Sequence, residues 1–151
     1  MPSNVQAGHR KNVIQSWYNS GRLLTIDTEG RALHFATLNG FPEYVDLNKG
    51  VNNAVFLSDG SLACISSGDK VSVHKTPSFE EVFEVKADGF VNAVEFIAPN
   101  KVAALTNKNT ITVYEDGAAV GSLNLGEEGL CINVSDDKST IYVGGSVSWS
   151  F

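Results

Sequence analysis

Three histidines, His9, His34 and His74, are the residues of this sequence best suited to binding a metal ion. A zinc site needs three or four ligands that converge on one point. His34 and His74 are separated by 40 residues. The chain has a repeat of nearly that length, described below, so we expect the two histidines at matching positions of neighbouring repeat units. Matching positions in a repeat favour a structural role, so we predict no metal site.

Three glutamates close together in the sequence, Glu80, Glu81 and Glu84, could pair for acid–base catalysis. A solvated strand explains them more simply, because charges on an exposed edge strand deter pairing with other chains. No serine stands in a Gly-x-Ser-x-Gly elbow. Gly144-Gly145-Ser146 lacks the spacing of a phosphate-binding loop. The sequence therefore predicts no catalytic residue, no cofactor and no enzyme activity.

The two cysteines, Cys64 and Cys131, each stand in an apolar run. Nothing in the sequence indicates an oxidising compartment, so we predict two buried free thiols that lie far apart. Asn133-Val134-Ser135 matches the glycosylation triplet but falls inside an apolar strand pattern, which indicates a chance match. Trp17 and Trp149 are single aromatic residues in strand-like runs, and we expect them to pack in the core or between repeats.

Composition limits the possible partners. The chain has 151 residues, 42% of them hydrophobic, and a net charge of −6. A nucleic-acid partner would require clustered lysines and arginines, and the longest basic run is only His9-Arg10-Lys11. No apolar run reaches the roughly 18 residues of a membrane-spanning helix. Residues 1–12 contain no apolar signal region, so we expect a cytoplasmic protein.

Turn signals recur at a nearly constant interval. The first set stands at Asn19-Ser20-Gly21, Ser58-Asp59-Gly60, Pro99-Asn100 and Asp136-Asp137-Lys138, with spacings of 39, 40 and 38 residues. Between the turns, runs of four to eight residues alternate in polarity or are continuously apolar, which is the pattern of β-strands. The chain therefore reads as a repeat of about 39 residues, four strands to each unit, without helices.

The predicted strands fall at four positions of this repeat. Strands at the first position are 12–18, 52–57, 91–97 and 130–135, and those at the second are 22–27, 61–66, 101–106 and 139–144. Strands at the third are 31–36, 70–75 and 110–114, and those at the fourth are 43–47, 81–85 and 119–125.

Four strands in about 40 residues is the requirement for one blade of a β-propeller. One blade is a small sheet with two apolar faces, so blades must stack around an axis to bury them. We predict an all-β chain that forms one partial propeller over residues 1–151. Its approximate blades are 8–47, 51–85, 90–125 and 129–151, the last incomplete.

The motifs at the start of the chain resemble those of the WD-repeat family. Gly8-His9 stands where such repeats carry a Gly-His pair, and Thr28-Glu29-Gly30 stands where they turn into the third strand. The Trp-Asp pair is missing, and its place is taken by His34-Phe35, His74-Lys75 and Tyr114-Glu115. We therefore do not assume the buried His–Asp hydrogen-bond network of strong WD repeats.

Within these repeats, the chain is similar to the second propeller of the actin-interacting protein 1 family. The likeness is carried by residues 8–14, 20–23 and 27–30 in the first blade and by 130–135 with 140–145 in the last, and it spans nearly the whole chain. It implies a non-catalytic scaffold of the cytoskeleton that binds actin filaments and helps cofilin disassemble them. The family's actin-contacting residues are not matched here, so the protein-binding residues are unassigned.

Two other functions remain as alternatives. One is a WD-repeat scaffold in another assembly, such as RNA processing or trafficking. The other is a fragment of a propeller enzyme with a metal on its axis, which needs acids and histidines at the starts of the innermost strands. Those positions hold Asn12, Val51-Asn52, Val91-Asn92 and Leu130, which are mostly amide and apolar residues and disfavour the enzyme.

The last unit departs from the repeat. After Gly145 the expected turn and third strand are replaced by residues 146–151, so we count three blades and two strands of a fourth, whereas closed propellers have four to eight blades. The chain is then either part of a longer propeller or a half-propeller that closes with another chain. In either case we expect apolar faces on the first and last blades, and self-association through them.

Overall fold

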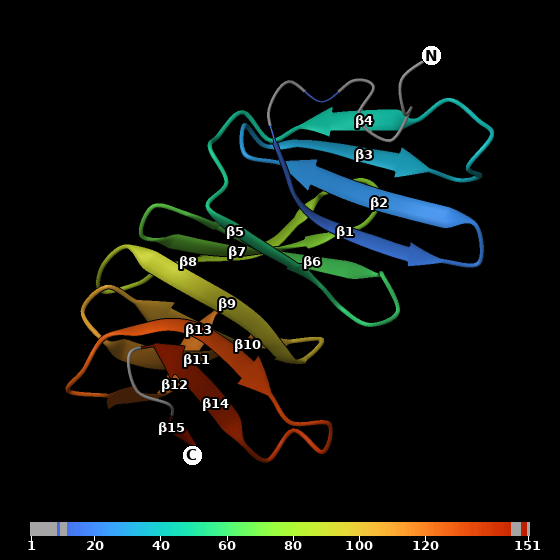
Figure 1. The fold of residues 1–151 in the computed structure, drawn as a ribbon. Helices are drawn as coiled ribbons and strands as arrows, with labels where there is room; N and C mark the ends of the chain where they lie inside the picture. The colour runs from blue at the N-terminus through green and yellow to red at the C-terminus, as the bar shows by residue number, and fades with distance from the viewer. Residues whose placement is uncertain (1–8, 10–11, 146–148, 151) are drawn as a thin grey trace.

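The computed structural model describes His9, residues 12–145 and residues 149–150. Every regular element in that part is a β-strand, and all pairing is antiparallel (Figure 1). None of the described residues forms a helix that could span a membrane. The prediction of an all-β chain is therefore confirmed for the described part.

The strands form four separate sheets, and each sheet follows the order of the sequence. Sheet 1 contains β1 (Val13–Asn19), β2 (Arg22–Asp27), β3 (Arg31–Phe35) and β4 (Glu43–Asp46). Sheet 2 contains β5 (Asn53–Phe56), β6 (Leu62–Ser67), β7 (Lys70–Lys75) and β8 (Glu81–Lys86). Sheet 3 contains β9 (Val91–Ala98), β10 (Lys101–Thr106), β11 (Thr110–Glu115) and β12 (Ala118–Asn124). Sheet 4 contains β13 (Gly129–Val134), β14 (Ile141–Gly145) and β15 (Trp149–Ser150).

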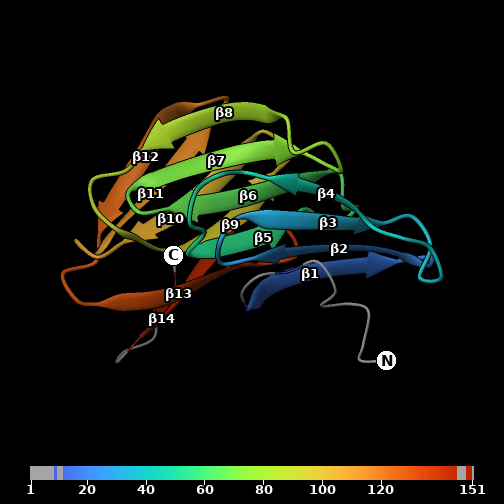
Figure 2. The ribbon, with the colours of Figure 1, turned by 90° about the horizontal axis from the view of Figure 1, so that it is seen from above.

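The first strands of the four sheets lie next to one another. β1 contacts β5, β5 contacts β9 and β9 contacts β13. From these strands the sheets fan outward, and β8 and β12 lie at the far rim (Figure 2). This radial arrangement is consistent with a β-propeller-like fold.

Three apolar clusters hold successive sheets together. Ile26 and Ala32 of sheet 1 pack on Ala63 and Ile65 of sheet 2, and a second cluster joins sheets 2 and 3. In the third, Ala103 and Leu105 of sheet 3 meet Val143 of sheet 4. The second strands β2, β6 and β10 are the most deeply buried, because each lies between neighbouring strands in its own sheet and has both faces covered.

The observed strands agree with the predicted spans to within two residues, and the four-strand order is confirmed for sheets 1 to 3. Sheet 4 differs, because it has three strands and not two. Its third strand is formed by Trp149 and Ser150, which pair with Val143 and Tyr142 of β14. The repeat pattern did not predict β15, since the sequence before it lacks a turn signal such as Asp-Gly or Asn-Gly.

The two end faces of the array also differ from each other. Leu23, Leu33 and Phe35 form a buried cluster in sheet 1 on the face away from sheet 2. Tyr18 and Tyr44 pair with Leu23 and Leu33 and share that face, and they are 58% and 61% exposed, so the expectation of an exposed apolar face on the first blade holds only in part. On sheet 4 the expectation holds. Leu130 and Tyr142 expose about half of their surface, at 54% and 48%.

Candidate functional site

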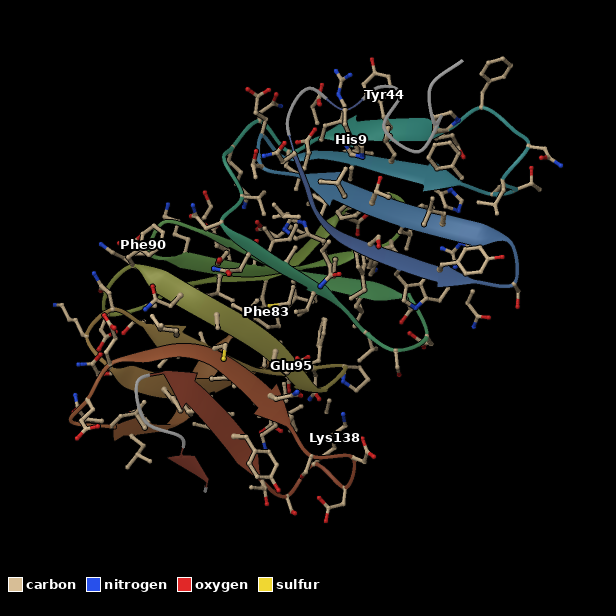
Figure 3. All side chains as sticks on the ribbon, in the orientation of Figure 1. His9, Tyr44, Phe83, Phe90, Glu95 and Lys138 are labelled. Atoms are coloured by element: carbon tan, nitrogen blue, oxygen red, sulfur yellow. The ribbon has the colours of Figure 1, made fainter. Side chains whose placement is uncertain are left out.

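His9 is held in a buried hydrogen-bond network at one end of sheet 1 (Figure 3). Its Nδ1 lies 2.9 Å from Oδ2 of Asp27, and its Nε2 lies 2.6 Å from Oγ1 of Thr25. The side chains of His9 and Asp27 are 1% and 0% exposed. An ionised carboxylate can only accept a hydrogen bond, so Nδ1 carries the hydrogen and donates the hydrogen bond to Asp27. We did not assume a buried His–Asp hydrogen bond from the sequence, and the structure has one in the first sheet.

The other carboxylate oxygen of Asp27 orders the turn between β2 and β3. Asp27 Oδ1 accepts hydrogen bonds from the backbone N–H groups of Glu29 and Arg31, at 2.9 and 3.0 Å. One buried carboxylate thus fixes both the hairpin turn and the imidazole of His9. Full satisfaction of its oxygens is what makes a buried charge tolerable.

His34 and His74 do not occupy matching positions. His34 pairs with Leu24 across the sheet, whereas His74 pairs with Ala63. The hairpin between β6 and β7 is one residue shorter than the hairpin between β2 and β3, which shifts the register by one and turns the two rings to opposite faces. The predicted matching placement of these histidines is therefore wrong.

His34 and His74 each form hydrogen bonds with groups of their own sheet. His34 Nε2 accepts from Arg22 Nε at 2.9 Å, and burial and the Arg22 charge lower the pKa of His34. His74 lies 2.8 Å from Ser72 Oγ and 2.9 Å from the carbonyl oxygen of Phe79, and burial lowers its pKa. Within the described residues no three His, Cys, Asp or Glu side chains are grouped as metal ligands.

The glutamates at the start of β8 do not converge on one site. Glu80 faces Lys75 at 3.7 Å, and Glu84 lies between Lys49 at 3.5 Å and Lys70 at 3.9 Å. Glu81 is an exposed edge residue. These contacts are surface ion pairs, which contribute little to stability and do not position an acid and a base on one reacting group.

The glycines near the C-terminus are explained by close packing. A Cβ atom on Gly144 would lie 2.6 Å from Sγ of Cys131, and one on Gly145 would lie 2.5 Å from the carbonyl oxygen of Glu128. Ser146 lies outside the described residues. Gly144 and Gly145 therefore permit close approach of β13 and β14 and do not line a phosphate-binding loop.

Both cysteines are free, as predicted, but only Cys64 is buried. Burial raises the pKa of the Cys64 thiol far above its usual range. Cys131 is exposed, because it lies on the face of sheet 4 that no described residue covers. The prediction of two buried thiols is wrong for Cys131, since the apolar run around it has only one covered face. In the glycosylation triplet Asn133-Val134-Ser135, the first two residues are the last of β13, and Asn133 is exposed.

Trp17 packs between sheets 1 and 2, as expected. Its Nε1 donates to the carbonyl oxygen of Ser58 at 3.0 Å, and the guanidinium of Arg22 lies over its ring. The side chain of Trp149 is not among those described. Sequence reasoning missed the residue that takes the corresponding place between sheets 3 and 4, which is Glu95.

Glu95 is a half-buried carboxylate at an otherwise apolar position. Trp17, Val55 and Glu95 pair with Leu24, Cys64 and Ala103 respectively, which are matching positions of the second strand. Burial raises the pKa of Glu95, and the nearby charge of Lys138 opposes that rise. The sequence signal was visible, because Glu95 interrupts the apolar run from Ala93 to Ile97.

Glu95 and Lys138 both line a pocket of about 400 Å³ (Figure 3). Its walls come from the end of β5 with the turn that follows it, including Phe56 and Asp59, and from the end of β9 with the turn that follows it, including Pro99. No ion pair within 4 Å joins Glu95 to any described residue. This pocket combines charged and apolar walls, and Ser58 and Asp59 also line it. The Glu95 carboxylate accepts a hydrogen bond from the backbone N–H of Phe96 at 3.0 Å.

No family model matches the chain, and no curated protein matches it. Among solved structures it is similar to two computationally designed proteins. It superposes on the designed Ika8 protein with a TM-score of 0.81 and 15% identity, and on the designed Ika4 protein with a TM-score of 0.78 and 15% identity. Each comparison covers 96% of this chain. The chain spans 47% of the Ika8 chain, about half its length, and 93% of the Ika4 chain. These likenesses concern the fold alone.

Proposed function

We propose that this chain is a non-catalytic scaffold of WD-repeat propeller blades that binds other proteins. The observation that carries the proposal is the contact of His9 with Asp27. The sequence placed His9 in the Gly-His pair of a WD-type repeat, and the buried imidazole and carboxylate lie 2.9 Å apart. A buried His–Asp pair is the structural signature that the WD-repeat resemblance implies, and its presence supports that assignment.

The surface chemistry also favours binding over catalysis. Glu80 and Glu84 form surface ion pairs, Asp27 orders a turn, and the described histidines bond to hydroxyl groups, backbone oxygens, Asp27 or Arg22. Large apolar side chains are exposed at several places on the surface, among them Phe41, Tyr44 and Phe90. Exposed aromatic residues are typical anchors of protein interfaces.

The partners we propose are actin filaments and cofilin, with a cytoplasmic, cytoskeletal location. This part of the proposal rests on the resemblance of the first and last units to the actin-interacting protein 1 family. A WD-repeat scaffold in RNA processing or trafficking is the alternative, and a fragment of a propeller enzyme is the less favoured one. We also propose that the open face of sheet 4 mediates self-association.

Co-sedimentation with filamentous actin tests the choice of partner. The chain is centrifuged with filaments alone and with filaments saturated by cofilin, over a range of chain concentrations. We expect saturable sedimentation that becomes tighter when cofilin is present. If the chain remains in the supernatant in both arms, the actin assignment is wrong and the scaffold of another assembly takes its place.

A further inference from the structure

The outer strand of sheet 3 differs from the outer strands of sheets 1 and 2. Strand β4 carries Glu43 and Asp46, and β8 carries Glu81, Glu84 and Lys86. Such charges on an edge strand discourage the addition of another strand. Strand β12 contains seven residues without any charge, Ala-Ala-Val-Gly-Ser-Leu-Asn, and every one of them is exposed. Of these three edges, only β12 lacks this protection.

Grooves run along both faces of β12. One, of about 630 Å³, separates it from the end of β8 and is lined by Lys86, Thr112 and Tyr114. The other, of about 300 Å³, lies toward sheet 4 and is lined by Lys101, Val113 and Ile141. Both grooves are also lined by Val120 and Gly121. Side chains of an added strand alternate between the two faces of a sheet, so each groove would receive every second side chain.

Gly121 stands at the centre of this strand, next to a β-bulge at which Val120 is the extra residue opposite β11. A Cβ atom on Gly121 would meet no other atom within 4 Å. A glycine inside a strand weakens it and often marks the close approach of another backbone. The missing side chain at Gly121 leaves room on a face of the sheet, beside the grooves that would receive the side chains of an incoming strand.

The ends of β12 indicate the charge of the occupant. Glu115 and Asp116 precede the strand, and Glu127 and Glu128 follow it. A second copy of β12 paired antiparallel would bring Asp116 close to Glu127 at both ends, and opposed like charges are destabilising. The lysines that line the grooves, Lys86, Lys101 and Lys138, lie on other strands and turns. The acidic ends therefore fit a partner with basic ends and not a second copy.

We propose that β12 binds an extended peptide segment of a partner protein by strand addition. The segment has small, β-branched side chains in its centre and basic residues at both ends. Its backbone pairs with the free edge of β12, and its side chains enter the two grooves. The inference deepens the proposed scaffold function, since it names the surface and the chemistry of a partner.

The probe is the fluorescein-labelled peptide Lys-Val-Thr-Val-Thr-Val-Lys, and its binding is followed by fluorescence anisotropy. Two further peptides carry N-methyl groups, one on its three valines and the other on its two threonines. Alternate N–H groups of a strand point to opposite edges, so strand addition needs only one of the two sets. We expect one methylated peptide to bind at least tenfold more weakly and the other to bind within about threefold of the parent. Equal losses, or no loss, for the two peptides would overturn strand addition.

Charge and location are tested with matched controls. We expect at least tenfold weaker binding of the same peptide with glutamate in place of both lysines.

The location is tested in two ways. Hydrogen exchange should slow along β12 when the basic peptide binds. The substitution Val120→Pro should weaken peptide binding at least tenfold, while Val82→Pro on β8 should not. Val120 and Val82 are matched at 55% and 50% exposure. Circular dichroism must show that both variants are folded. If Val120→Pro is not folded, Leu123→Pro takes its place. Protection on β4 or β8, or no binding of the basic peptide, overturns the inference. Either result leaves the actin assignment to be judged by co-sedimentation alone.

Discussion

The indole ring of Trp17 in sheet 1 lies directly against Gly60 in the turn between β5 and β6 of sheet 2. A Cβ atom on Gly60 would lie 2.6 Å from Cζ2 of the ring, and Gly60 has a positive φ of 74°. The ring also donates its N–H to the carbonyl oxygen of Ser58 in the same turn. One glycine thus sets how closely the first two sheets pack.

The first prediction concerns this contact. Gly60→Ala should lower the free energy of unfolding by about 3 kcal/mol, because it adds left-handed backbone strain to overpacking against the ring. Gly68→Ala is the matched control, since Gly68 also has a positive φ, 61°, but no atom within 4 Å of the added Cβ. Its cost should be about 1 kcal/mol of strain alone. Equal losses in urea denaturation would contradict the packing of Trp17 on Gly60.

The second prediction concerns the pH dependence of stability at Glu95. Burial raises the pKa of Glu95 above its ordinary 4.5, so the folded state holds its proton more tightly than the unfolded state. The resulting penalty is absent below pH 4.5, grows as pH rises through the folded pKa and is complete above it. Glu95→Gln should therefore be more stable than the native chain at pH 7 and equal to it near pH 4. A constant difference across this range would show that Glu95 titrates normally.

The third prediction separates the two thiols. Ellman's reagent should modify one cysteine rapidly in the folded chain and the second only on unfolding, because Cys131 is exposed and Cys64 is buried with a raised thiol pKa. Cys131→Ser should abolish the rapid phase, and Cys64→Ala should leave it intact. Two rapid phases in the native chain would place Cys64 at the surface.

The fourth prediction concerns self-association through sheet 4. Light scattering should give a mass about twice the 16.2 kDa of one chain, because Leu130 and Tyr142 present an uncovered apolar face. Tyr142→Lys should restore the mass of a single chain. Phe41→Lys is the control, since Phe41 is 99% exposed but lies outside that face. A native chain that remains a single, cooperatively unfolding species of 16.2 kDa would rule out this interface.

The repeat in turns and apolar runs predicted the fold well, because strand position follows from local hairpin chemistry. Turn signals such as Ser58-Asp59-Gly60 fix where two strands meet, and the alternation between them fixes which face is buried. β15 escaped prediction because two residues are too short to form a pattern, and its pairing with β14 is a tertiary contact.

The surroundings of the histidines were harder to predict from the sequence, because they depend on the register in which neighbouring strands pair. A turn shorter by one residue between β6 and β7 moved His74 to the opposite face from His34. Equal spacing in the sequence therefore did not mean equal position. The partnership of His9 with Asp27 joins residues 18 apart through a buried network, and it was not derivable while the Trp-Asp signature was missing.

We propose that the chain acts on actin filaments as a binding scaffold. Single-filament fluorescence microscopy tests it most directly, with filaments decorated by cofilin and the chain added at increasing concentrations. We expect severing and depolymerisation to accelerate with chain concentration, and filaments without cofilin to be little affected. Filaments that shorten at the same rate with and without the chain, at concentrations that saturate binding, would contradict the actin function.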